Sequence, residues 1–368
     1  MVDQAKALIG SEIRTEGWNQ QASRDAIRHY AFGLGDDNPL FSDLAYGQTT
    51  RYGSVIAPPT FLYTICDAAI CPGLPGVQPI YGGASWEWYR PVYLDEVLTS
   101  RAVLVDVQEV RGGRRAPRLL VQRGEVTYFD QNARPVGKVL SDTLRIPRAT
   151  AEEGLRYQER AEHQYTPAEM ADIEAAVAAE VRRGAETRYW EDVTVGETIP
   201  SVVKGPINQF TMTAYYAGCV GSPGYKAAEI AWKYRRWARE SPEKLPNQYD
   251  PSYFAEYVSP SMGHQHQGVA REIGMPGAYD NGPQRLGWAG HLLTNWCGDD
   301  GFMRALGFQL REAEIFGDTI WFSGRVSGVR EDESARGLVD IELWSTNQLG
   351  QQTARGTATV ELPRRTAR

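Results

Sequence analysis

The sequence has no excess of positive charge and no long hydrophobic run. Its 39 Lys and Arg residues are outnumbered by 46 Asp and Glu residues, which gives a net charge of −7. Nucleic-acid binders usually carry a basic face, so this balance predicts that the protein does not bind nucleic acid. No segment approaches the roughly 18 uninterrupted apolar residues of a membrane-spanning helix, and residues 1–6 lack the order of a signal peptide. We therefore expect a cytoplasmic protein that does not enter a membrane.

Cysteine and histidine are also scarce. The four cysteines, Cys66, Cys71, Cys219 and Cys297, form no CxxC pair, which argues against a zinc site and favours free thiols in a reducing compartment. Only five histidines are present. A mechanism that depends on histidine therefore has few candidate residues, and we expect no metal site.

The length of 368 residues suggests two domains, because typical domains contain about 100–200 residues. We expect a helical connector at 148–186 between an N-terminal unit, 1–147, and a C-terminal unit, 187–368. The connector helix is predicted to begin at a capping box formed by Thr166 and Glu169, with a proline at its first position, and to be closed by Gly184.

Both units end in segments that are rich in Val, Leu and Thr and alternate in polarity, as antiparallel strands do. Each also contains one helix candidate, at 59–70 and at 285–296. One helix followed by several strands in each half indicates an α+β fold. The expected strands are 97–110, 118–129, 136–146, 320–329, 338–346 and 352–362.

The two halves form a faint internal repeat, which we interpret as the duplication of one α+β unit. The offset is 223 residues over the middle of each half and 186 residues upstream, so the second half carries an insertion at about 222–258. The aligned pairs are Phe41 with His264, Pro59 with Gly282, Asp95 with Asp318 and, upstream, Tyr30 with Tyr216.

The segment 30–41 reads Tyr-Ala-Phe-Gly-Leu-Gly-Asp-Asp-Asn-Pro-Leu-Phe and resembles the hydratase signature of the MaoC family. Segments 55–61 and 86–92 look like the FAS1-like dehydratase N-terminal domains of that family, and 274–277 and 317–319 fit its second half more loosely. The resemblance implies a double hotdog fold, in which each half wraps a curved antiparallel sheet around a long helix. It also implies (R)-specific hydration of enoyl thioesters on CoA or a carrier protein, or the reverse dehydration, with no cofactor.

In the family, an Asp and a His five residues later activate water, and a glycine N–H at the start of the central helix binds the thioester oxygen. The first half keeps Asp36 and Asn38 but has Phe41 at the His position and Pro59, which has no N–H, at the glycine position. We therefore interpret this half as non-catalytic and acyl-binding. Asp36 and Asn38 are candidate substrate-binding residues, although a structural Asp36 that accepts from a loop N–H is favoured over a catalytic one.

The second half supplies the missing parts, because His264 and Gly282 stand at the family's His and glycine positions. We predict that His264 is the base or acid and that the Gly282 N–H is the oxyanion donor. Ser259 replaces the family Asp, so the partner of His264 stays open. Asp280 is the first candidate and Asp250 the second, and His264 acting alone is the third alternative.

Tyr279 and Arg285 flank this glycine and are candidate substrate-binding residues. Arg285 could meet a carboxylate or phosphate, and a salt bridge to Asp280 is an equally good interpretation.

The sequence thus predicts an enoyl-CoA hydratase or 3-hydroxyacyl dehydratase with one active site per chain, whose partner is an acyl-CoA thioester. Two alternatives remain, a hotdog thioesterase and a catalytically inactive acyl-CoA-binding subunit. The double unit resembles a pair of hotdogs in one chain, and a further homodimer is left open.

Overall fold

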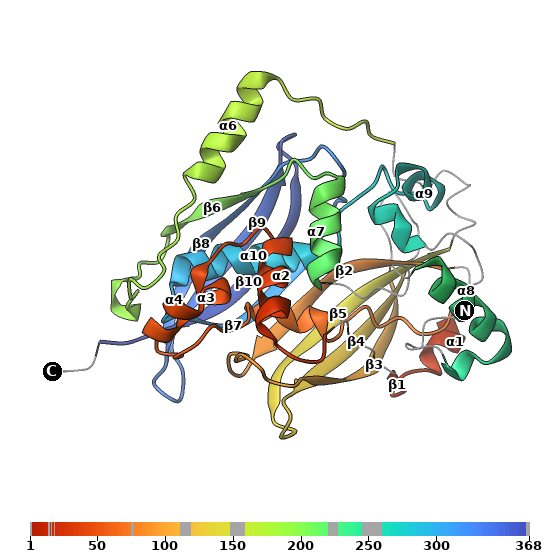
Figure 1. The fold of residues 1–368 in the computed structure, drawn as a ribbon, viewed down its shortest axis with the longest axis horizontal. Coiled ribbons are helices and arrows are strands. Elements are labelled where there is room, and N and C mark those ends of the chain that lie inside the picture. Colours follow the sequence, from red (N-terminus) through yellow and green to blue (C-terminus); the bar gives the residue numbers. More distant parts are fainter. Residues whose placement is uncertain are drawn as a thin grey trace.

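The computed structural model shows one continuous ten-stranded antiparallel sheet that is shared by both halves (Figure 1). Its strand order is β1-β3-β4-β5-β2-β7-β10-β9-β8-β6. Read from the centre outwards, each half repeats the same order, and the two halves meet where β2 pairs antiparallel with β7. The α+β double hotdog class is therefore confirmed. The structure describes residues 2–13, 15, 17, 19–74, 77–110, 119–147, 159–219, 227–244 and 260–365.

The six predicted strands are all present, with ends within a few residues of those expected. Their side chains alternate between buried and more exposed along β4, for example, as the pattern of polarity required. The strands of the first half are β1 (Glu12–Ile13), β2 (Val77–Trp88), β3 (Thr99–Val110), β4 (Leu119–Phe129) and β5 (Pro135–Pro147). Those of the second are β6 (Thr198–Lys204), β7 (Phe302–Leu310), β8 (Ile320–Glu331), β9 (Gly337–Asn347) and β10 (Gln352–Leu362).

The glycine-rich stretch 73–83 runs into the centre of the sheet. Strand β2 begins there at Val77 and pairs with both β5 and β7. Its glycines serve close packing, because a Cβ at Gly83 would lie 2.4 Å from the carbonyl oxygen of Phe308. The glycines therefore mark a tight approach between two strands and not a loop.

The long central helix predicted at 285–296 is present as α10 (Gly282–Cys297), with a proline in its first turn. All but two of its residues, the exceptions being Gly282 and Thr294, are buried. It runs under the sheet among core residues from both halves. The other helices are α1 (Val2–Lys6), α2 (Arg24–Gly33), α3 (Pro39–Ser42), α4 (Leu44–Thr49), α6 (Pro167–Ala178), α7 (Gln209–Cys219), α8 (Ala228–Glu240) and α9 (Gln267–Glu272).

The first half lacks the long helix that the resemblance implied. Residues Pro59–Thr64 form only a 3₁₀ turn, η1, and Ala68 has a positive φ of 58° that interrupts any helix. The Tyr128 hydroxyl donates to the carbonyl of Cys66 at 2.8 Å, and the Ser141 hydroxyl donates to that of Ala68. Side chains of the sheet thus bind carbonyls that a longer helix would use itself. The other short 3₁₀ turns are η2 (Trp190–Asp192), η3 (Pro242–Lys244) and η5 (Pro260–His264).

Helices α2 and α7 are the repeat-related pair that carries Tyr30 and Tyr216, and they pack against each other at the front of the molecule (Figure 1). Glycines permit this close approach, since a Cβ at Gly218 would lie 2.2 Å from the carbonyl oxygen of His29. The two halves are thus joined by this helix pair as well as by the central strands.

The connector helix forms as predicted. Helix α6 begins after Thr166, whose hydroxyl and the Glu169 carboxylate make the expected capping box, and Pro167 is in its first turn. The helix ends earlier than expected, at Ala178, and Gly184 follows with a φ of 59°. Its side chains are mostly exposed, and Ile173 is its only buried one.

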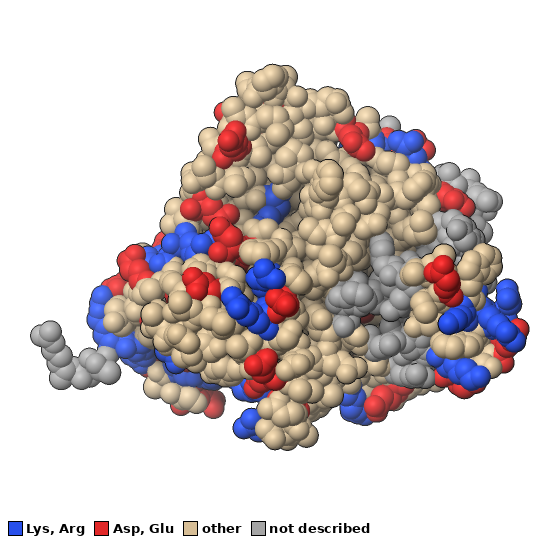
Figure 2. Space-filling model, in the orientation of Figure 1, with Lys and Arg blue, Asp and Glu red and all other residues tan. Residues whose placement is uncertain are grey.

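Helix α7 carries no Lys, Arg, Asp or Glu, whereas α6 carries acidic side chains and charge is mixed in sign over much of the rest of the same face (Figure 2). Within the ranges that the structure describes, no helix is both long enough and apolar enough to cross a bilayer.

Candidate active site

His264 is the last residue of η5, and its imidazole is held against the loop that enters α10. Its Nδ1 atom lies 3.1 Å from the carbonyl oxygen of Tyr279 and 3.0 Å from that of Asp280. Carbonyl oxygens only accept hydrogen bonds, so Nδ1 must carry the proton. In the neutral ring the lone pair is then on Nε2, which is the form a general base needs.

The surroundings of His264 favour this neutral form. The ring is half-buried, its centroid lies 4.1 Å from that of Tyr279, and the ring of Tyr216 follows at 6.1 Å. Burial lowers the pKa of His264 to about 4, although the two carbonyls act in the opposite direction. The imidazole is therefore uncharged at neutral pH.

Gly282 begins α10 two residues after the carbonyl that His264 contacts. The N–H groups of a first helical turn have no partner within the helix and point along the positive end of its dipole. A side chain at this position has no room, because a Cβ would lie 2.6–2.8 Å from three atoms of Tyr81. Glycine is thus required for packing at this position, and its N–H belongs to the first turn of α10.

Tyr81 reaches this site from β2 of the first half. Its hydroxyl lies 3.0 Å from that of Tyr63, which accepts a hydrogen bond of 2.8 Å from the Trp86 indole. This chain of aromatic residues supports the ring that covers Gly282. The sequence offered no signal for the contact between Tyr81 and Gly282, because these residues are about 200 positions apart.

The carboxylate of Asp280 pairs with Arg285, and both side chains are buried. The salt bridge that the sequence left as one alternative for Arg285 is therefore present. Asp280 contacts His264 through its backbone carbonyl, and its own N–H donates to the carbonyl of Glu314 at 3.0 Å. Glu314 was not anticipated from the sequence. It is fully buried, and desolvation raises its pKa to about 8.

Asp36 and Asn38 lie at a different place. Asp36 accepts from the N–H of Asn38 at 3.0 Å, and Asn38 in turn caps α3 by accepting from Leu40 at 3.0 Å. The hydrogen bond expected of a structural Asp36 is thus present. The Asp36 carboxylate is also 3.6 Å from Nε2 of His291, which is about 13 Å along α10 from Gly282 at 1.5 Å per residue.

A buried cluster of charged groups surrounds His291, and the sequence did not reveal it. Nζ of Lys204 lies 2.7 Å from its Nδ1 and also donates to the carbonyls of Leu34 and Gly35 at 2.9 and 3.0 Å. Glu180 from the connector lies 2.9 Å from its Nε2. The cluster joins both halves and the connector at one point, which indicates a role in holding them together.

Asp250, the second candidate partner of His264, and Ser259, which replaces the family Asp, lie outside the described residues. So does much of the predicted insertion, within which α8 is described. All four cysteines are free thiols. Within the described ranges, no three His, Cys, Asp or Glu side chains come together in a way that could hold a metal ion.

Comparison with known proteins supports the resemblance in two ways. One match covers the first half alone, and matches to solved structures cover the whole chain. Residues 7–139 match a family model described as the FAS1-like, dehydratase domain region, which confirms the resemblance of the first half to FAS1-like dehydratase domains. The chain is also similar to UPF0336 proteins of Parafrankia sp. (strain EAN1pec), at 31% identity over 99 residues, and of Streptomyces avermitilis, at 30% over 99 residues. These matches cover 24% and 25% of this chain and only 64% and 66% of the relatives.

Among solved structures, similarity extends over the whole chain. A MaoC-like dehydratase has a TM-score of 0.66 at 17% identity, with 98% of this chain and all of that chain covered. A MaoC-like dehydratase from Phytophthora capsici has a TM-score of 0.55 at 14% identity, with both chains fully covered. A conserved hypothetical protein from Mycobacterium tuberculosis with a double hotdog fold has a TM-score of 0.54 at 10% identity and covers 96% of each chain. These likenesses establish the double hotdog fold.

Proposed function

We propose that this protein hydrates an enoyl thioester to a 3-hydroxyacyl thioester, or catalyses the reverse reaction, at a single site in its second half. The observation that carries the proposal is the neutral His264 imidazole held against the entry to α10, whose first residue is Gly282. A base and an oxyanion donor are the two parts that this reaction needs. The matches to dehydratase-type proteins agree with the same chemistry.

His264 can perform both proton transfers by itself. Its Nε2 takes a proton from water while the water oxygen forms a bond to the β-carbon and the carbon–carbon π electrons shift toward the thioester. The Gly282 N–H stabilises the negative charge on the thioester oxygen. The imidazolium then returns the proton to the α-carbon. Atoms and charge balance without a carboxylate, so the interpretation in which His264 acts alone is preferred.

In this proposal, Asp280, Arg285 and Glu314 position the loop. The buried Asp280–Arg285 pair and the hydrogen bond from Asp280 to Glu314 hold the two carbonyls that orient the imidazole. The substrate-binding roles predicted for Tyr279, Arg285, Asp36 and Asn38 stay predictions. CoA is the proposed carrier, the cytoplasm is the proposed location, and a homodimer stays an open prediction.

The direct test incubates the purified chain with crotonyl-CoA and with longer enoyl-CoA thioesters. We expect loss of the enoyl absorbance and formation of a 3-hydroxyacyl-CoA that mass spectrometry detects as a gain of one water. Release of free thiol without hydration would instead identify a thioesterase. Saturable binding without any turnover would identify an inactive acyl-CoA-binding subunit.

The pH dependence of hydration gives a sharper prediction. Neutral His264 is the active base, so activity is present above its pKa and is lost as pH falls through it. Because that pKa is lowered to about 4, kcat/KM should stay level from about pH 8 to pH 5, fall to about half near pH 4, and drop about tenfold per pH unit below that. Circular dichroism at each pH must show a folded protein, because acid also titrates structural carboxylates. A decline centred near pH 6.5 would contradict the proposed environment of His264.

A further inference from the structure

The part of the connector before α6 packs against the loops that carry the proposed active site. We call this part, residues 159–165, the strap. The backbone N–H of Arg160 donates to the carbonyl of Pro276 at 3.1 Å, in the loop that leads to α10. A Cβ at Gly317 would lie only 2.7 Å from the backbone nitrogen of His163. The strap is therefore a packed part of the second half and not a free tether between the halves.

The side chain of Arg160 binds the carboxylate of Asp318. Asp318 is 1% exposed, and its carboxylate also accepts from the N–H of Ile315 at 2.7 Å and from the Gln348 side-chain amide at 2.7 Å. A buried carboxylate needs a compensating positive charge, and within the described ranges Arg160 is the cation that pairs with it. The Arg160 side chain itself is 25% exposed, so replacing it opens no cavity in the core.

Backbone contacts lead from Ile315 to the carbonyls that orient His264. Ile315 forms an isolated antiparallel bridge with Tyr279. Next to this bridge, the N–H of Asp280 donates to the carbonyl of Glu314 at 3.0 Å. The carbonyl oxygens of Tyr279 and Asp280 lie 3.1 and 3.0 Å from Nδ1 of His264. The position of the turn that contains Asp318 therefore determines where these two oxygens meet the imidazole.

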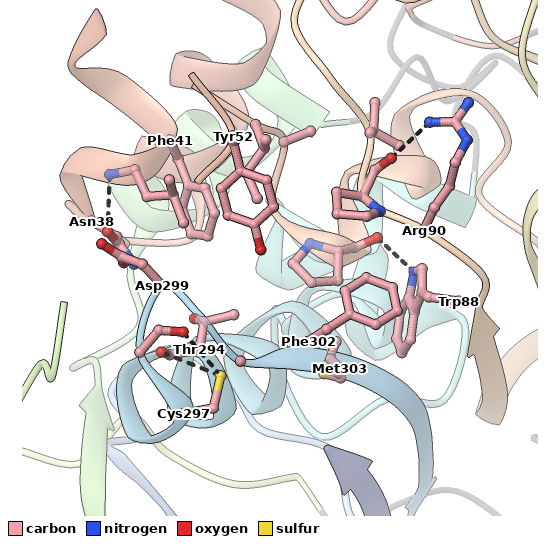
Figure 3. Close-up of a pocket in the computed structure, with 18 residues that line it drawn as sticks. Asn38, Phe41, Tyr52, Trp88, Arg90, Thr294, Cys297, Asp299, Phe302 and Met303 are labelled. Carbon is pink, nitrogen blue, oxygen red and sulfur yellow. Dashed lines mark hydrogen bonds between the residues drawn. The ribbon is translucent and has the colours of Figure 1, made fainter. Parts of the chain in front are cut away.

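The first half shows a similar backbone arrangement without this ion pair. Ile56 and Tyr93 form an isolated antiparallel bridge there. Asp95 aligns with Asp318 but is exposed, and it forms no ion pair within the part of the chain that the structure describes. Figure 3 shows Phe41, which stands at the position of the base, among the side chains that line a pocket on that side. The buried arginine–aspartate pair thus accompanies the half that has the imidazole.

We propose that Arg160 is a positioning residue for the hydration site and that, through Asp318 and the bridge at Ile315, it holds the two carbonyls that keep the proton of His264 on Nδ1. Without its cation the buried carboxylate is uncompensated, so the turn around it should shift and move the bridge. A misplacement of about 1 Å can cost about 100-fold in rate. The kinetic consequence rests on the proposed function, whereas the orientation of the imidazole is measured without substrate.

The first test is ¹⁵N NMR of the full chain with labelled histidine at pH 7. The chain has five histidines, and the spectrum of His264→Ala assigns the signals of His264. In the wild type we expect one neutral tautomer with the proton on Nδ1. In Arg160→Met we expect both neutral tautomers, because the hydrogen bond to one ring nitrogen decides which nitrogen is protonated. A wild-type ring protonated on Nε2, or an unchanged spectrum in Arg160→Met, would overturn the proposal.

The second test measures the hydration of crotonyl-CoA. Arg160→Met should lower kcat by about 10- to 100-fold with little change in KM, because the base is displaced while the substrate contacts stay. Arg160→Lys should restore part of this loss, since it keeps the charge but lacks the forked guanidinium. A loss confined to KM would place Arg160 at the substrate and would refute the positioning role.

Arg271→Met is the matched control. Arg271 of α9 lies 3.7 Å from Glu159 of the strap, and the two side chains are 45% and 66% exposed. This variant removes an ion pair to the strap without touching Asp318, so kcat and the tautomer of His264 should not change. Equal effects of Arg271→Met and Arg160→Met would show that loosening the strap is sufficient, and the proposed route through Asp318 would be wrong.

Two further outcomes are decisive. If Arg160→Met does not fold, Arg160→Lys takes its place in the NMR test, and a wild-type spectrum for that variant refutes the proposal. If the wild type has the Nδ1–H tautomer and Arg160→Met loses it, but neither protein hydrates an enoyl-CoA, the positioning role of Arg160 stands and the proposed function fails.

Discussion

Replacing His264 with alanine should lower the hydration rate by about 10²–10⁴-fold, the usual contribution of a general acid–base residue. The loss should appear in kcat, because His264 is proposed to act on the proton in the transition state. It should be larger than any effect on stability, since the imidazole is only half-buried and its hydrogen bonds are to two backbone carbonyls. The measurement is the steady-state rate with crotonyl-CoA, together with a urea denaturation curve.

His266 supplies the matched control. It is exposed and caps α9 by accepting from the N–H of Val269 at 3.3 Å, so His266→Asn keeps a capping group while removing a neighbouring imidazole. We expect this variant to retain nearly full activity.

Asp36→Ala tests the assignment of the halves, and it should mainly lower stability. If Asp36→Ala lost as much activity as His264→Ala while staying folded, the catalytic role would belong to the first half.

Replacing Lys204 with methionine should lower the free energy of unfolding by about 3–5 kcal/mol, the usual cost of breaking a buried charge network. Its ammonium group contacts His291 and two backbone carbonyls, and it is buried among Asp36 and Glu180. Burial by itself would raise the pKa of Glu180, but the contact with His291 and, to a smaller extent, the charge of Lys204 lower this pKa to about 2. Without Lys204, two carboxylates and two carbonyls would be left with less compensation.

The control for this prediction is Lys138→Met. Lys138 lies 3.9 Å from Glu87 in a pair whose side chains are 29% and 57% exposed, and such pairs contribute at most about 1 kcal/mol. Urea denaturation of both variants gives the comparison. Equal small losses would show that the buried cluster does not hold the two halves and the connector together.

The sequence predicted those features that depend on neighbours along the chain. Alternating polarity placed six strands, and the Thr166–Glu169 capping box placed the start of α6 because both partners are only three residues apart. The internal repeat placed Gly282 at the start of the central helix. The spacing between corresponding residues of the two halves is preserved in the folded chain, even where the sequence identity between the halves has nearly disappeared.

Features that depend on distant residues were not predicted. In the first half, the side chains of Tyr128 and Ser141 donate to the carbonyls of Cys66 and Ala68, beyond the end of the 3₁₀ turn η1. No local sequence pattern indicates these contacts. The partner of His264 was sought among carboxylates, whereas the structure supplies two backbone carbonyls. Backbone groups are present at every position, so sequence identity cannot indicate which of them will face a side chain.

The sequence by itself determined the class of fold, the duplicated spacing and the residues from which a base and an amide donor could come. Only the tertiary structure decided how the imidazole is oriented, that Tyr81 of the other half covers Gly282, and that Lys204, His291, Glu180 and Asp36 gather into one buried cluster. Periodicity and capping act within a few residues and can be read along the chain. Desolvation and the pairing of buried charges depend on which distant segments the sheet and α10 bring together.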